Sequence, residues 1–187
     1  MIYFKKILLL FIISLCICNN GNGTTTANFL EIDVGSRATA MGGAYVSLCN
    51  DPSAIFWNPS GLTSINKREA MFMYQPYWDD SNIIFAGIAS PINNSSYFGL
   101  GILMLNWGEI EETTLNYQDG TGIIFTPNEY SFSFSYARKF VDWFSFGSSL
   151  KYIASNLDVG QISGSAIAID FGVMIETDFF SSKDTKE

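Results

Sequence analysis

Large apolar residues alternate with small or polar ones along much of the second half of the chain. The clearest stretch runs from Tyr130 to Tyr136 and reads Tyr-Ser-Phe-Ser-Phe-Ser-Tyr. A helix would scatter these two kinds of side chain around its circumference, whereas a strand sends successive side chains to opposite faces. The pattern therefore predicts a strand with one aromatic face and one face of small hydroxyls.

Five further segments are also predicted to be strands. Residues 144–152 and 166–175 alternate in this way, and three earlier segments are more uniformly apolar and rich in glycine and aromatic residues. These earlier segments are residues 70–77, 82–92 and 96–107. The connections at 93–95 and 139–142 are short, whereas those at 106–128 and 155–164 are long and polar. We predict an all-β fold with about six antiparallel strands.

Two architectures fit such strands. Short turns on one side, long loops on the other and strands of about 9 to 11 residues are typical of a transmembrane β-barrel in an outer membrane. A soluble antiparallel sandwich also alternates, but its solvent face carries charged and long polar side chains. Here the face opposite the large apolar residues carries serine, glycine and alanine. This composition favours the barrel, with the apolar face against membrane lipid.

The beginning of the chain has the pattern of an export signal. Lys5 and Lys6 precede an apolar run over residues 7–17, which is followed by a polar exit. The run is shorter than the ~20 residues that a spanning helix needs. We predict a signal peptide over residues 1–18; cleavage after Gly23, and lipid modification of a cysteine at the end of the run, are alternatives. Residues 181–187 form a polar tail.

Composition and charge exclude several classes of function. The chain has 187 residues, a net charge of -8, ten Lys and Arg residues without a basic stripe, and no histidine. Nucleic-acid binding requires clustered positive charge, and histidine is the commonest general base and a frequent metal ligand. The acidic pairs at 79–80 and 111–112 lack the spacing of a calcium loop. We therefore expect no enzymatic activity, no cofactor, no metal and no nucleic-acid partner.

The segment 41–62 interrupts this pattern. Asp51 can cap a helix whose first residue is Pro52, and Pro59 disfavours helical geometry at the residue before it. A short helix over 53–57 followed by a type I turn is therefore predicted. The segment is either a compact plug inside a barrel or a set of ordinary turns.

The motifs in this region resemble those of the PorV and FadL-like outer-membrane proteins. Residues 35–46 read GSRATAMGGAYV and residues 51–62 read DPSAIFWNPSGL, which is similar to the family's G-x-R-A-x-A-M-G-G-A run followed by W-N-P-A-G-L. The resemblance implies a helical N-terminal hatch over residues 19–66 and barrel strands over 67–180. The hatch or ligand-path positions that it carries over are Arg37, Met41, Gly42, Gly43, Trp57, Asn58, Pro59 and Gly61.

The same resemblance implies a location in the bacterial outer membrane and two possible functions. FadL-like members transport hydrophobic small molecules, and glycines in a strand permit a bend, so Gly99 and Gly101 are candidates for a lateral kink that releases ligand. Their alternative role is to make room for the hatch. PorV-like members are components or docking platforms of type IX secretion, with secreted proteins as partners.

The number of strands raises further interpretations. A closed barrel needs roughly eight strands for an interior that side chains alone can fill, and six strands are fewer than that. The sequence is therefore also compatible with a truncated fragment without independent function, and with a barrel assembled from several copies.

Overall fold

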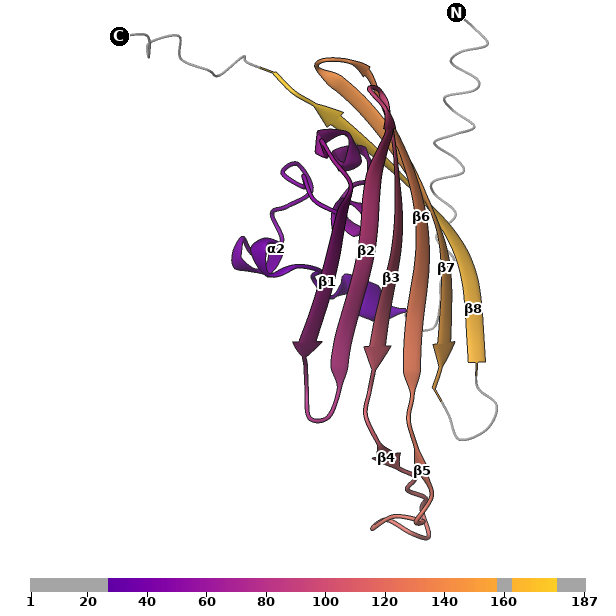
Figure 1. Cartoon of the computed structure of the whole chain (residues 1–187). Coiled ribbons are helices and arrows are strands. Elements are labelled where there is room, and N and C mark those ends of the chain that lie inside the picture. Colours follow the sequence, from indigo (N-terminus) through magenta and orange to yellow (C-terminus); the bar gives the residue numbers. More distant parts are fainter. Residues whose placement is uncertain (1–26, 158–162, 178–187) are drawn as a thin grey trace, which may run out of the picture.

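A six-stranded antiparallel sheet dominates the computed structural model, which describes residues 27–157 and 163–177 (Figure 1). The sheet consists of β1 (Glu69–Pro76), β2 (Asn82–Asn93), β3 (Ser96–Asn106), β6 (Asn128–Val141), β7 (Phe144–Asn156) and β8 (Ser163–Ile175). Its spatial order follows the chain. The predicted all-β fold and its six strands are thus confirmed. The predicted signal peptide and polar tail lie outside the described residues.

The sheet has two different ends. The turns between β2 and β3 and between β6 and β7 lie at one, which we call the turn end, and the longer connections lie at the other, the loop end. Register shifts occur only near the turns, between Pro91 and Asn93 and between Lys139 and Val141, among the pairings of the described strands. The sheet does not close into a barrel within the described residues, where β1 and β8 form its edges.

One of the long polar connections contains two short strands that were not predicted. Residues 107–127 contain a second, two-stranded sheet made of β4 (Ile110–Glu111) and β5 (Ile124–Phe125). This small hairpin extends beyond the loop end of the main sheet (Figure 1). Its strands are too short for alternation to be recognised in the sequence.

The two faces of the main sheet have the predicted composition. Phe132 and Ile169 lie on the outer face with exposed fractions of 49% and 61%, whereas Ser133 and Ala168 are partly buried on the inner face. Register explains the shared facing, because Phe132 is paired with Tyr152 and Tyr152 with Ile167 across three strands. The outer face is therefore a broad exposed apolar surface, and such surfaces mark contact with a membrane or a partner.

Residues 27–66, which we call the N-terminal segment, pack on the inner face (Figure 1). Its elements are η1 (Asn28–Glu31), α2 (Ser36–Ala40), α3 (Ala54–Trp57) and η2 (Pro59–Ser64). The core lies between this segment and the sheet: Ile55 and Leu62 pack with Ala89 of β2, and Phe29 packs with Phe85. None of the helices in the described residues has the length and apolarity to cross a membrane, a finding that does not concern strands.

The predicted helix in this segment is nearly correct. It begins at Ala54, with Ser53 as the N-cap residue and no side-chain capping hydrogen bond. The Asp51 carboxylate, predicted to be the cap, accepts instead from the Ser53 amide at 2.9 Å in the turn before the helix. The type I turn predicted after it is instead the start of the 3-10 helix η2. The Asn58 side chain accepts from the Ser60 amide at 3.1 Å and so caps that helix.

Candidate functional site

Glycines on the inner face let the N-terminal segment touch the backbone of the sheet. A Cβ atom at Gly147 of β7 would lie 2.5 Å from the Pro59 carbonyl carbon, and one at Gly172 of β8 would overlap Asn58 Oδ1. No side chain fits at Gly147 without moving the backbone of Pro59 and Ser60, and none fits at Gly172 without moving the Asn58 side chain. The conformation of this stretch therefore depends on two glycines that lie far from it in the sequence.

Gly99 and Gly101 of β3 have a similar environment. Their Cβ atoms would lie 2.7 Å from Ile55 Cγ1 and 3.0 Å from Ile55 Cγ2, so the Ile55 side chain fills the space beside both glycines. Pairing with β2 and β6 continues through both positions without a register shift. Room for the N-terminal segment accounts for these glycines, and the lateral exit for ligand stays a prediction.

Asn58 connects the N-terminal segment to the last strand. Its amide nitrogen donates hydrogen bonds to the Val46 carbonyl at 3.0 Å and to the Val173 carbonyl of β8 at 3.4 Å. Its amide oxygen accepts from the Ser60 hydroxyl at 2.7 Å in addition to the amide of that residue. Every polar atom of this buried side chain is therefore used, as a buried amide requires.

The hydroxyl face of the sheet serves the same contact. Thr63 of η2 donates to the Ser145 hydroxyl at 3.0 Å, and the Ser135 and Ser149 hydroxyls share a hydrogen bond at 2.6 Å. The predicted row of small hydroxyls therefore satisfies polar groups under the segment. Ser131 is the exception, because its buried hydroxyl has no partner within the described part of the chain.

Three of the remaining carried-over positions are glycines, and each has a backbone reason. Gly42 and Gly43 have φ angles of 63° and 77°, in the left-handed region that favours glycine. A Cβ atom at Gly61 would lie 2.5 Å from the Cys49 carbonyl oxygen. Met41, by contrast, is exposed at the end of α2.

Arg37 and Trp57 hold the loops of the N-terminal segment together. The Arg37 guanidinium donates to Asn50 Oδ1 at 2.8 Å and lies over the Tyr45 ring. The Tyr45 hydroxyl donates to Asp51 at 2.7 Å. Burial is the larger cause that raises the pKa of Tyr45, and this hydrogen bond is the second. Trp57 Nε1 donates to the Val34 carbonyl at 2.8 Å. These contacts are internal to the segment and support its fold.

An ion pair lies beneath the segment. Lys151 of β7 and Asp170 of β8 approach to 2.6 Å on the inner face, with side-chain exposures of 11% and 40%. The Lys151 ammonium lies 5.5 Å from the centre of the Phe56 ring, so the segment covers the lysine of the pair. The sequence does not reveal this pair, because it depends on the register between two strands.

Cys49 is fully buried in this site, and its thiol donates to the Val46 carbonyl at 3.3 Å. Burial raises the pKa of the thiol to about 11. The thiolate is the form that reacts with alkylating reagents, so a raised pKa and lack of access both protect the sulfur.

We therefore expect Cys49 to react with iodoacetamide at pH 8 at least about 100-fold more slowly in the folded protein than in urea, because the pKa returns to its ordinary value on unfolding. The measurement is mass spectrometry of the peptide that contains Cys49 over a time course. Equal rates in the two states would show that the N-terminal segment does not bury the thiol.

The described residues contain no cluster of potential metal ligands. No group of three or more His, Cys, Asp or Glu side chains is placed to bind a metal in residues 27–157 and 163–177. The expectations about enzymatic activity, cofactors and metals stay predictions.

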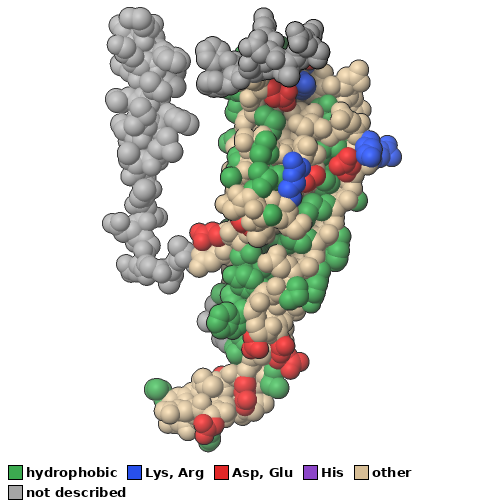
Figure 2. Space-filling view, turned by 90° about the vertical axis from the view of Figure 1, so that its left-hand side faces the viewer, with side chains coloured by type: hydrophobic (Ala, Val, Ile, Leu, Met, Phe, Trp, Pro, Cys, Tyr) green, Lys and Arg blue, Asp and Glu red, His purple; other side chains and the backbone are tan. Residues whose placement is uncertain are grey.

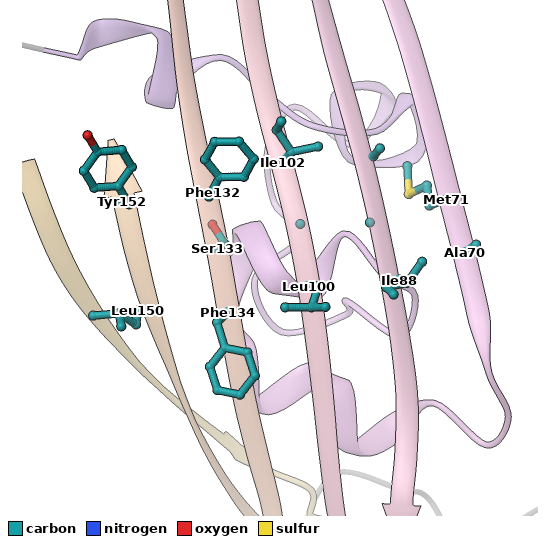
Figure 3. Close-up of a pocket in the computed structure, with 13 residues that line it drawn as sticks. Ala70, Met71, Ile88, Leu100, Ile102, Phe132, Ser133, Phe134, Leu150 and Tyr152 are labelled. Carbon is teal, nitrogen blue, oxygen red and sulfur yellow. The ribbon is translucent and has the colours of Figure 1, made fainter. Parts of the chain in front are cut away.

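The outer face bears a shallow apolar hollow of about 660 Å³ that crosses five strands. Figure 3 shows its walls, in which Phe132, Phe134, Leu100 and Ile102 surround glycine positions on β2 and β3. The smaller Ala86 of β2 forms part of its floor. The hollow is continuous with the apolar outer face and has no charged side chain in its lining.

An antiparallel sheet with an exposed apolar outer face and a polar, covered inner face is typical of membrane-embedded β-sheet proteins. The family can be named from sequence comparison. The family described as "Type IX secretion system protein PorV" matches residues 18–186, so the chain belongs to the PorV family. This confirms the PorV resemblance and the predicted location in the outer membrane. A search of curated proteins found no match.

Proposed function

We propose that this protein is a docking platform for secreted proteins in type IX secretion at the outer membrane. The observation that carries the proposal is the family match over residues 18–186. The arrangement of surfaces agrees with it: the outer face suits lipid, and the N-terminal segment covers much of the inner face, where it acts as the hatch. The loop end and the turn end are then the surfaces that remain for partners.

Transport of hydrophobic small molecules, the other function that the resemblance implied, has no comparable support. The family description names secretion. Ile55 fills the space beside Gly99 and Gly101 where a lateral path was expected. A platform of this kind needs no catalytic step, and the absence of enzymatic activity stays a prediction.

The proposal is tested by deleting the gene in the source bacterium and measuring type IX substrates at the cell surface and in the medium. We expect at least about a tenfold loss of secretion, which the wild-type gene restores, with unchanged uptake of a fluorescent fatty acid. Normal secretion together with reduced uptake would replace docking by transport.

A further inference from the structure

The hairpin at residues 107–127 is held together by hydrogen bonds between its two sides. Besides the β4–β5 pairing, the Glu112 amide donates to the Ile123 carbonyl and the Thr121 amide to the Glu112 carbonyl, both at 2.8 Å. The Glu111 carboxylate accepts from the Gly122 amide at 2.9 Å. At its base the Trp107 indole donates to the buried Glu129 carboxylate at 3.3 Å. These hydrogen bonds hold the backbone of the hairpin in a defined arrangement.

The apolar side chains of the hairpin are exposed on its surface and are not packed in a core. Leu115 is 94% exposed and Tyr117 65% exposed, and Ile123 and Ile124 are also exposed. Such residues bury little surface for the hairpin's own stability, since the hairpin projects away from the sheet (Figure 1). An exposed group of leucine, isoleucine and tyrosine on an ordered projection is characteristic of a protein contact.

The charged side chains of the hairpin, at the loop end, are all negative. The hairpin carries Glu109, Glu111, Glu112 and Asp119, and no Lys or Arg occurs between residues 69 and 137. Figure 2 shows acidic side chains and no basic ones at the loop end of the face in view. The basic pairs 67–68 and 138–139 lie at the turn end instead.

Charge separates the two surfaces that could cover these apolar residues. Anionic lipid headgroups attract basic segments and repel acidic ones, so a hairpin built to lie on a membrane would carry Lys or Arg beside its apolar residues. A protein surface with positive charge would be attracted, and opposite charges accelerate association and fix its orientation.

We propose that the 107–127 hairpin is a docking surface for a protein partner that presents an apolar patch bordered by Lys and Arg. This inference rests on the proposed function, which it deepens by stating the chemistry of the partner. Leu115 and Tyr117 supply the apolar contact, and Glu109 and Asp119 supply the charge. Glu111 and Glu112 are engaged in hydrogen bonds within the hairpin.

The test uses the full-length protein in the living bacterium, with a photo-crosslinking amino acid at position 115. The same amino acid at Phe171, on the outer face of β8, serves as the control for contact with lipid. We expect a discrete protein adduct from position 115 whose crosslinked peptide contains Lys or Arg. The double variant Glu109→Lys with Asp119→Lys should reduce this adduct at least about tenfold.

Glu176→Lys, at the turn end, is the matched charge change and should leave the adduct unchanged. If the double reversal prevents membrane insertion, Glu109→Gln with Asp119→Asn is used, with a smaller expected loss of adduct. Lipid adducts only, or a protein adduct that is insensitive to both sets of variants, would overturn the inference.

Secretion measured in the same strains separates this inference from the proposed function. If gene deletion abolishes secretion while the charge-reversed hairpin secretes normally and loses no adduct, the hairpin inference fails and the platform stands. If gene deletion leaves secretion intact, the platform fails whatever the adducts show.

Discussion

Gly147→Val should displace the N-terminal segment from the sheet. A Cβ atom at this position meets the backbone of Pro59 and Ser60, which cannot rotate away as a side chain could. Overpacking of this kind typically costs about 1 to 3 kcal/mol. Because the contact holds the segment and not the strand pairing, we expect the sheet to form and residues 27–66 to become accessible to protease.

The measurement is limited proteolysis of the protein in lipid vesicles, with mass spectrometry of the fragments. Gly164→Val is the matched control, because a Cβ atom at Gly164 has no atom within 4 Å. In the Gly147 variant Cys49 should also react faster with iodoacetamide. A segment that stays protected in the Gly147 variant would show that the glycine contact does not hold it in place.

The second large effect is expected for Ile169→Arg. This side chain lies in the middle of β8 on the outer face, and an arginine against hydrocarbon near the bilayer midplane costs about 2 to 4 kcal/mol in outer-membrane barrels. Phe132→Arg should behave in the same way. The free energy of unfolding is measured by urea titration of the protein in lipid vesicles.

The choice of control for this experiment follows from the structure. Ser133 and Ala168 face inward, but both are register partners of Lys151, so an arginine at either position would meet a like charge. Ala166, inward on β8 and exposed, is the better site for arginine, and Ile169→Leu controls for packing. An equal loss of stability at positions 166 and 169 would contradict the assignment of the outer face to lipid.

The six strands were predictable because each has a local signal. In residues 130–136 every second side chain is aromatic, and the facing that this implies is the facing in the structure. The short helix Ala54–Trp57 was predictable for a similar reason, since the prolines at 52 and 59 that bound it are close to it in the sequence. Properties carried by neighbouring residues can be read from the sequence.

The features that were missed depend on residues far apart in the chain. The Lys151–Asp170 pair requires the register of β7 against β8. The role of Gly147 requires knowing that Pro59 packs against it. The hairpin strands Ile110–Glu111 and Ile124–Phe125 have two residues each, which is too short for an alternating pattern to separate them from a loop.

The hydrogen bond from Asn58 to the Val173 carbonyl has a consequence for the order of folding. It joins residues 115 positions apart. Within the main sheet, by contrast, each strand pairs with the strand of that sheet that follows it in the sequence. Contacts that close long loops form late, because their entropic cost is met only when most of the chain is already arranged. We therefore expect residues 27–66, which leave the ribosome first in the described chain, to pack against the sheet after its strands have paired.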